Sequence, residues 1–283
     1  MAPEEHRIQS IGLVYNARVE RSLPLAREVL AWLENRGIDA WSCAISEHAK
    51  ADAPADLLIT LGGDGSILRV AQRAAPAGIP ILGINLGRVG FLTETTPDHW
   101  RATLEGVLRG KCSVESRMML CVTLVRDGQA IAQEQALNDA VVSRGALART
   151  VRLHTAIDGA LMTRYVADAL ILATPTGSTA YAYAVGGPIL PPWVSNIVVV
   201  PAAPHLSMER PLVLDAQSVV EVEVETQIPG MLSVDGRMEG ELLNGDVVRI
   251  EQSAIRTRFL RLRDSNDFYK TLVDRLTPRN GVP

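Results

Sequence analysis

The sequence predicts an α/β domain followed by a mainly antiparallel β domain. Strand and helix signals alternate over the first hundred residues, and this alternation favours a parallel sheet with helices on its faces. After about residue 111, dipeptides typical of two-residue hairpin turns recur, and the run 219–225 has the period-two alternation of a half-buried strand. We therefore expect an α/β domain over residues 1–110, completed by about 265–283, and a β-rich domain over 111–264.

The elements of the first domain follow from apolar runs and from helix start and stop signals. Ser22 stands two residues before Pro24, which favours a helix with Ser22 as its N-cap, and Gly37 ends that helix. The predicted strands cover 8–15, 38–43, 57–61 and 79–84, and two further helices are predicted over 66–75 and from 96 to about 110.

The second domain is marked by turn signals and by one block of small residues. The hairpin turns are predicted at Asp127-Gly128, Asp158-Gly159, Asp235-Gly236 and Asn244-Gly245. The block 174–181 follows the strand-like run 169–172, and we expect a helix there that is capped by Ser178. Residues 267–276 have a helical pattern and are expected to return to the first domain.

Composition excludes several classes of protein and of site. The net charge is −4 with no basic block, so nucleic acid is not an expected partner. The three cysteines are far apart and no Cys/His cluster has metal-ligand spacing, so we expect no disulfide, no protein-bound metal and a cytoplasmic location. No apolar run approaches the ~20 residues of a membrane span, and the acidic N-terminus lacks the apolar segment of a signal peptide, so no membrane association is expected.

The turn Gly62-Gly63-Asp64-Gly65 directly follows the apolar run 55–59. Glycine lets the backbone approach a ligand closely, and successive N–H groups in such a turn bind anions. A carboxylate beside a phosphate site is electrostatically unfavourable unless it takes part in the chemistry or holds Mg²⁺. Asp64 is therefore a candidate general base, and the alternative is a strand–helix turn with Asp64 as the N-cap.

Three further carboxylate or amide side chains stand next to predicted strands. Asn138 and Asp139 precede a strand, and together they offer the donors and acceptors that suit a ribose or an adenine edge; the alternative is an Asx-type turn. Asp168 precedes the strand-like run 169–172 and is either a strand-edge cap or a ligand contact. Arg149 and Arg164 are candidates for neutralising phosphates, although lone arginines are usually solvated.

The block 174–184 is rich in small hydroxyl residues and glycine, which let a backbone approach a flat ligand. Tyr181 and Tyr183 either stack on a base or fill the core.

In order and spacing, these blocks resemble NAD kinase over nearly the whole chain. The matching segments are Gly62-Gly63-Asp64-Gly65, Asn85 to Thr93, Asn138-Asp139, Asp168 with Thr174 to Pro188, Pro204-His205, Arg210-Pro211 and Val234-Asp235-Gly236. The first turn alone is also found in lipid kinases and phosphofructokinases, whereas the block from Thr174 to Pro188 is highly specific.

The resemblance implies a Rossmann-like α/β domain followed by a β domain. It implies phosphorylation of the 2′-hydroxyl on the adenosine ribose of NAD, which gives NADP. The expected phosphoryl donor is ATP with Mg²⁺ or another divalent metal, or polyphosphate, and the family suggests a homodimer or homotetramer.

Transferred to this sequence, the resemblance makes Asp64 the general base and directs Arg69 toward phosphate. The residues implied to bind NAD or ATP are Asp64, Gly65, Arg69, Asn138, Asp139, Arg149, Asp168, Thr179, Ala180, Tyr181, Ala182, Tyr183 and Ala184.

The chain departs from the family's pattern at three places. Pro191-Pro192 stands where His-Pro is common, Ser66 stands where threonine is usual, and Arg237 stands where glutamine is frequent. Two other functions share part of the pattern: a lipid or sugar kinase with the same turn, and a dinucleotide-binding sensor without activity.

Overall fold

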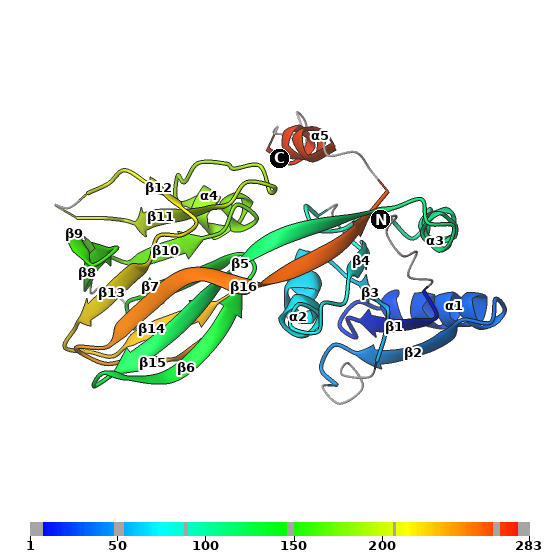
Figure 1. The fold of residues 1–283 in the computed structure, drawn as a ribbon, viewed down its shortest axis with the longest axis horizontal. Coiled ribbons are helices and arrows are strands. Elements are labelled where there is room, and N and C mark those ends of the chain that lie inside the picture. Colours follow the sequence, from blue (N-terminus) through cyan, green and yellow to red (C-terminus); the bar gives the residue numbers. More distant parts are fainter. Residues whose placement is uncertain are drawn as a thin grey trace, which may run out of the picture. The chain divides into compact units, whose positions relative to one another are not determined.

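The structure is a computed structural model that describes residues 8–47, 54–87, 90–145, 150–205, 208–262 and 267–276 (Figure 1). The chain divides into two units: unit 1 comprises residues 1–116 and 257–283, and unit 2 comprises residues 117–256. Two long strands, β5 (Ser113–Arg126) and β16 (Val247–Arg261), run from one unit into the other.

Unit 1 contains the predicted parallel sheet. Its strands are β1 (Ser10–Tyr15), β2 (Asp39–Ala44), β3 (Leu57–Leu61) and β4 (Ile81–Ile84), in the spatial order β2-β1-β3-β4. Neighbouring strands in this order are parallel, and the end of β16 adds a further parallel contact at Phe259 and Ile81. The α/β prediction is therefore confirmed for this part of the chain.

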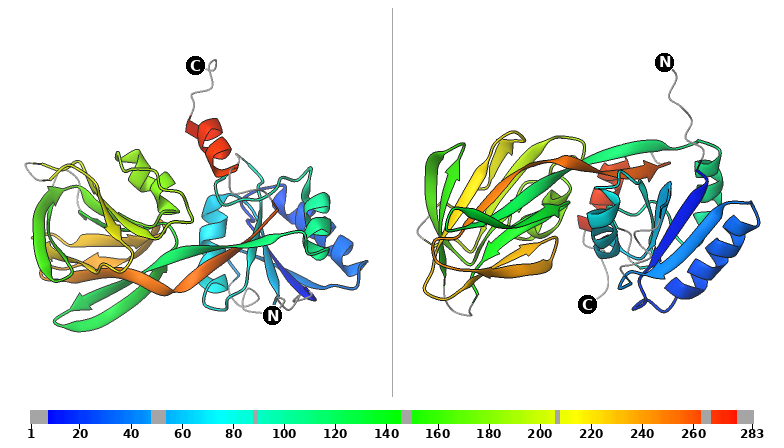
Figure 2. Two further views of the ribbon diagram at one scale, coloured as in Figure 1. Left: turned by 45° about the horizontal axis from the view of Figure 1, so that its top comes forward. Right: turned by 60° about the horizontal axis from the view of Figure 1, so that its bottom comes forward.

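Helices cover both faces of these strands (Figure 2). α1 (Ser22–Glu34) and α3 (Trp100–Leu108) share one buried apolar cluster with side chains of β1, β3 and β4. α2 (Asp64–Ala74) packs on the opposite face, where Ile67 lies against Gly83 of β4. α5 (Asp267–Leu276) belongs to unit 1, as predicted, and its Phe268 ring lies 6.2 Å from that of Phe91.

The prediction that Ser22 caps α1 is wrong. Arg21 is the N-cap residue, and the side chain of Ser22 is buried within the first turn. Its hydroxyl donates to the carbonyl oxygen of Asn16 at 2.7 Å, so it ties the helix to the preceding loop rather than to its own N–H groups. Gly37 follows the helix with a φ of +72°, as the stop signal predicts.

The strands of unit 2 are antiparallel and belong to two sheets, the first of which continues through β16 into the parallel strands of unit 1. In the first sheet, β16 pairs with β5 and with β13 (Val220–Glu225); the other strands are β6 (Gln129–Ala136), β8 (Val151–Ile157) and β9 (Ala160–Ala167). The second sheet has the order β12-β11-β10-β7-β14-β15. Its strands are β7 (Asp139–Ser143), β10 (Ala169–Ala173), β11 (Asn196–Ala202), β12 (Leu212–Asp215), β14 (Gly230–Val234) and β15 (Arg237–Leu242).

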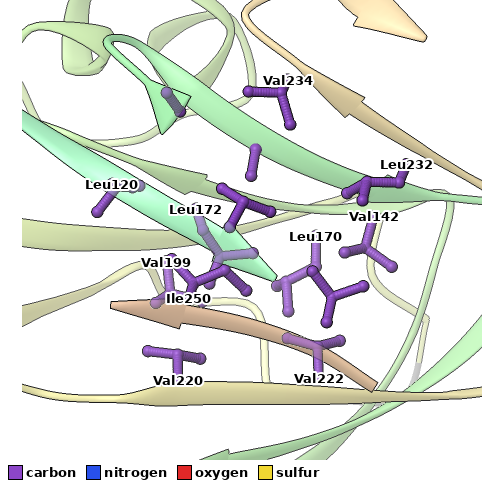
Figure 3. Close-up of a cluster of buried hydrophobic side chains, with 14 of the residues drawn as sticks. Leu120, Val142, Leu170, Leu172, Val199, Val220, Val222, Leu232, Val234 and Ile250 are labelled. Carbon is purple, nitrogen blue, oxygen red and sulfur yellow. The ribbon is translucent and has the colours of Figure 1, made fainter. Parts of the chain in front are cut away.

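The two sheets of unit 2 share one apolar core (Figure 3). Val220 and Val222 of β13 face inward from the first sheet, and Leu170 and Leu172 of β10 face inward from the second. The mainly antiparallel β prediction is therefore confirmed.

Three of the four predicted hairpin turns have the expected backbone. Asp127-Gly128, Asp158-Gly159 and Asp235-Gly236 all have positive φ at both residues, as a type I′ turn requires. Asn244-Gly245 differs, because only Gly245 has a positive φ and four residues separate β15 from β16. Among the described residues, no helix is long and apolar enough to cross a membrane.

Candidate functional site

The glycine-rich turn joins the carboxyl end of β3 to the first residue of α2. Gly63 is the N-cap residue and Asp64 begins the helix. A Cβ at Gly62 would lie 2.8 Å from the Cβ of Ser66, so this position requires glycine for packing. A Cβ at Gly63 or Gly65 would meet no atom within 4 Å, so the surface of the turn is open there. The first N–H groups of a helix have no partner within it, and here they line the same turn.

Asp64 does not cap its helix; its carboxylate binds a loop that is distant in sequence. Oδ2 accepts a hydrogen bond from the backbone N–H of Phe91 at 2.9 Å, and Oδ1 accepts one from Leu92 at 3.1 Å. We call this pair of N–H donors the amide clamp. The N-cap alternative for Asp64 is therefore wrong, and the carboxylate has a defined orientation beside the open glycine turn.

Two neighbours complete the surroundings of Asp64. A Cβ added to Gly90 would overlap the carboxylate, which therefore fits only because residue 90 has no side chain. Nη1 of Arg275, on α5, lies 3.9 Å from Oδ2, and its guanidinium stacks 4.7 Å from the centre of the Phe91 ring. Arg69 is exposed on α2, and no ion pair is recorded for it within the described ranges.

In unit 2, Asp235 holds the segment that contains Asn138 and Asp139. Its carboxylate accepts hydrogen bonds from the N–H groups of Leu137, Asn138 and Asp139, at 2.9, 2.7 and 3.2 Å. The N–H of Asp235 in turn donates to the carbonyl of Asp139 at 2.9 Å. The predicted hairpin turn therefore serves as an anchor for this segment, which the sequence reasoning did not find.

The block that starts at Thr174 packs against the same segment. Thr174 donates its hydroxyl to the carbonyl of Leu137 at 2.6 Å, and its N–H binds the carbonyl of Asn138 at 2.8 Å. Gly177 approaches so closely that a Cβ there would collide with the backbone of Asn138. The structure thus brings together two of the predicted blocks, 138–139 and 174–184.

Asp139 is a buried carboxylate in this arrangement, with 6% of its surface exposed. Burial, and then the negative charge of Asp235, raise the pKa of Asp139 from 3.8 to about 7. No hydrogen bond is recorded for its carboxyl oxygens among the described residues. A buried carboxylate of this kind is suited to accept hydrogen bonds from a ligand.

Residues 179–184 present their aromatic side chains outward. Thr179 ends a short 3₁₀ helix, η2 (Gly177–Thr179), Ala180 follows it, and α4 (Tyr181–Ala184) completes the block. Tyr181 and Tyr183 are 44% and 40% exposed, whereas Ala182 is buried, so the alternative in which the tyrosines fill the core is wrong. Ala184 is exposed beside them.

Ser178 is not a side-chain cap, contrary to the prediction. Its hydroxyl donates to the carbonyl of Pro175 at 2.6 Å and accepts from the N–H of Leu190 at 2.9 Å. The buried Arg117 supports the same turn, because its Nη1 donates to the hydroxyl of Thr176 at 3.1 Å.

Asp168 lies at the other end of β10 from the Asn138 segment. The N–H of Arg144 donates to the carbonyl of Asp168, and Ala173 pairs with Asp139, so five residue steps, about 17 Å of strand, separate Asp168 from the level of Asp139. Oδ2 of Asp168 lies 3.2 Å from Arg144, so this carboxylate has an ion-pair partner in unit 2. The structure does not bring Asp168 together with Asn138 and Asp139, and Arg149 lies outside the described residues.

Arg237, which stands where glutamine is frequent, is held by two carboxylates. Its Nη2 lies 3.1 Å from Glu239 and 3.4 Å from Glu134. Within the described ranges, no group of three or more His, Cys, Asp or Glu side chains has the arrangement of a metal site.

Comparisons with known proteins extend these observations. Residues 40–112 match the ATP-NAD kinase N-terminal domain and residues 137–262 match the ATP-NAD kinase C-terminal domain. The NAD kinase of Chloroflexus aurantiacus is 39% identical over 95% of this chain and 99% of its own.

Two solved structures share the fold. Yeast NADH kinase, crystallised with NADH, aligns with a TM-score of 0.83 and 24% identity, over 99% of this chain and 90% of its own. An Archaeoglobus fulgidus NAD kinase, crystallised with ATP, aligns with a TM-score of 0.75 and 24% identity, over 94% and 97%. The family models and the near full-length relative confirm the resemblance that the sequence motifs predict, and this chain belongs to the NAD kinase family.

Proposed function

We propose that this NAD kinase transfers the γ-phosphoryl group of Mg²⁺-ATP to the 2′-hydroxyl of the adenosine ribose of NAD, with Asp64 as general base. The observation that carries the proposal is the amide clamp, which holds the Asp64 carboxylate in one orientation beside the open glycine turn. A carboxylate has about four lone-pair positions and the clamp uses two, so others remain for a substrate proton.

In the proposed reaction, Asp64 accepts the proton of the 2′-hydroxyl while that oxygen attacks the γ-phosphorus. The bond from phosphorus to the bridging oxygen breaks, and ADP leaves with the electron pair. The N–H groups around Gly63 and Gly65 stabilise the charge on the transferred group. Mg²⁺ enters as part of the ATP substrate; this ion usually keeps several waters and phosphate oxygens as ligands, so it does not need a dedicated cluster of protein carboxylates.

The donor and its contacts are proposed on separate grounds. ATP is supported by the family's description as ATP-NAD kinase and by the ATP complex of the Archaeoglobus fulgidus relative. Arg69 is exposed on α2, five residues beyond Asp64, and we propose that it binds donor phosphates with the turn at Gly65. Polyphosphate remains the second donor to test.

We propose that NAD binds in unit 2 at the block 179–184 and the segment 138–139. The exposed rings of Tyr181 and Tyr183 offer faces for stacking, Thr179, Ala180 and Ala184 lie on the same short block, and the buried Ala182 anchors it. Asn138 and Asp139 would bind ribose or amide groups, because one side chain offers donors and acceptors and the other is a buried acceptor. NAD contacts by Arg149 and Asp168 stay predictions, and so do the homodimer or homotetramer and the cytoplasmic location.

The experiment incubates the purified protein with NAD and Mg²⁺-ATP and detects NADP with an NADP-specific dehydrogenase. Asp64→Asn keeps the shape of the side chain and is expected to lower kcat by about 10²–10⁴-fold, the usual contribution of a positioned base. Asp98→Asn is the matched control, because it removes an exposed carboxylate elsewhere in unit 1 and should leave kcat unchanged.

Near-normal turnover by Asp64→Asn would show that Asp64 is not the base. A parallel reaction with polyphosphate in place of ATP decides the donor. Tight binding of NAD without turnover with either donor would favour the sensor alternative.

A further inference from the structure

We propose that Arg261 is a positioning residue for the reaction, because it holds the backbone segment that orients Asp64. The inference rests on the proposed role of Asp64. Arg261 is the last residue of β16 and belongs to unit 1, like Asp64. Its side chain is only 10% exposed, and it contacts the carbonyl of Leu92, a residue of the amide clamp, rather than the carboxylate of Asp64.

The connection between Arg261 and Asp64 passes through a single residue. Nη1 of Arg261 donates to the carbonyl oxygen of Leu92 at 3.0 Å, and the N–H of Leu92 donates to Oδ1 of Asp64 at 3.1 Å. Both polar groups of Leu92 are thus engaged, one by the arginine and the other by the carboxylate. A shift of the carbonyl of Leu92 would turn this part of the loop and would move one or both donors of the clamp.

Arg261 is itself fixed by two carboxylates. Its Nε donates to Glu115 at 2.6 Å, and Nη1 also lies 3.3 Å from Glu94. The side chain of Glu94 is only 1% exposed, and its second oxygen accepts the N–H of Leu262 at 2.9 Å. Glu94 therefore joins the end of β16 to the loop that carries the amide clamp.

Geometry rather than charge makes arginine suitable at this position. Arg261 directs Nε and Nη1 to different partners at the same time, which the planar guanidinium allows. A lysine at residue 261 would keep the positive charge, but its single ammonium on a flexible stem does not reproduce this fork. Arg261→Lys therefore separates loss of charge from loss of position.

The loop has a second attachment, to the parallel sheet. The N–H groups of Glu94 and Thr95 both donate to the carbonyl of Gly83, at 2.8 and 3.2 Å. Arg261→Lys leaves this attachment in place, so the substitution should change the direction of the two N–H donors of the clamp without detaching the loop from the sheet.

The test compares Arg261→Lys with Arg126→Lys. Arg126 forms a similar ion pair in unit 2, at 2.7 and 2.8 Å from Asp246, whose side chain is only 2% exposed. We expect Arg261→Lys to lower kcat by about 10- to 100-fold, because a misplacement of ~1 Å costs up to about 10²-fold. KM for NAD should change less than kcat. Arg126→Lys should lower the melting temperature by a similar amount with kcat within twofold of wild type.

A double-mutant cycle separates positioning from general damage. If Arg261 acts through Asp64, then Arg261→Lys added to Asp64→Asn lowers kcat by less than twofold. An equal loss in both backgrounds would overturn the inference. A loss of kcat in Asp64→Asn without a loss of kcat in Arg261→Lys would also overturn the inference about Arg261, while leaving the proposed function intact. A normal kcat in Asp64→Asn would refute the proposed role of Asp64, and the inference about Arg261 would be refuted with it.

A second variant covers the case in which Arg261→Lys does not fold. Replacing Arg261 by methionine and Glu94 by leucine removes the more buried of the two ion pairs as a unit, which proteins tolerate better than the loss of one partner, and leaves only the partly exposed Glu115 without Arg261. This folded double variant is expected to lose kcat by the same 10- to 100-fold. Wild-type kcat in the folded double variant would contradict the inference.

Discussion

Replacement of Gly90 by alanine should disable the enzyme by displacing the carboxylate of Asp64. The added Cβ would overlap Oδ1 and would lie 2.6 Å from Cγ and 2.9 Å from Oδ2 of Asp64. Ordinary contacts of a Cβ start at 3.4 Å, so the carboxyl carbon must retreat by roughly 1 Å. The φ of Gly90 is not in the left-handed region, so the effect arises from the collision and not from backbone strain.

The magnitude follows from the displacement. A shift of about 1 Å in a catalytic group costs up to about 10²-fold in rate, and complete loss of base catalysis would cost about 10²–10⁴-fold. The two hydrogen bonds from the amide clamp to a charged acceptor contribute about 1.5–3 kcal/mol each when intact. Because Asp64 is partly exposed, water replaces part of that loss, and we expect Gly90→Ala to destabilise unit 1 by only about 1–3 kcal/mol.

The assay measures kcat for NADP formation and, separately, the free energy of unfolding in urea. Gly240→Ala is the matched control, because a Cβ at Gly240 meets nothing within 4 Å. We expect kcat to fall at least 30-fold, on the order given by such a displacement, in folded Gly90→Ala and to stay unchanged in Gly240→Ala. A folded Gly90→Ala protein with normal kcat would refute the reasoning, because the carboxylate cannot keep its position beside that methyl group.

Four further substitutions, at Gly63, Gly65, Asp139 and Gly177, test other parts of the two sites. A Cβ at Gly63 or Gly65 would meet no atom within 4 Å, so replacing either glycine by alanine should leave the melting temperature unchanged. The same replacement should raise KM for ATP, because the added methyl group stands where the phosphates approach the turn. An unchanged KM for ATP in both variants would contradict the phosphate site. Because the pKa of Asp139 is raised to about 7 from 3.8, the folded state keeps a proton that the unfolded state releases between these values. The free energy of unfolding should therefore fall as the pH rises through that window, and Asp139→Asn should flatten this dependence; equal slopes in urea titrations of both proteins would count against it. Gly177→Ala should lower both the melting temperature and NAD affinity, because its Cβ would collide with the backbone of Asn138; a wild-type melting curve would argue against this close approach.

The fold could be predicted from local signals where the chain itself carries the information. Val220 to Glu225 alternates valine and glutamate because one face of β13 is buried, and the three Asp-Gly turns have the positive φ values that their composition predicts. Ser22 shows the limit of such signals. Its type suits an N-cap, but a carbonyl at Asn16 is a better partner in the folded chain, and only the tertiary structure places that carbonyl within reach.

The candidate site could be located from sequence in part, because glycine clusters and paired polar residues are visible there. The partners of Asp64 were not visible: the donors lie 27 and 28 residues further along the chain, and they are backbone N–H groups that any residue except proline provides. The separation of Asp168 from Asp139 depends on strand register, since five residues of β10 lie between the two positions. That distance follows only from the pairing of β7 with β10.

In both units, an aspartate carboxylate accepts hydrogen bonds from backbone N–H groups of a distant segment, but the group that is positioned in this way differs. In unit 1, the backbone N–H groups of residues 91 and 92 orient a carboxylate, Asp64, that we propose takes part in the chemistry. In unit 2, the carboxylate of Asp235 orients the N–H groups of residues 137–139 and thereby places Asp139. The carboxylate is the group that is oriented in unit 1 and the group that orients in unit 2, so replacing aspartate by asparagine should affect kcat in one unit and stability in the other. Asp64→Asn should lower kcat at a small cost in stability, because Asp64 is partly exposed and water can replace a hydrogen bond lost from the clamp. Asp235→Asn should destabilise unit 2 by about 1–3 kcal/mol, because it leaves buried N–H groups with a poorer acceptor. A kcat loss in Asp235→Asn without loss of stability would mean that Asp235 contacts the substrate directly, and the parallel between the two units would then not hold.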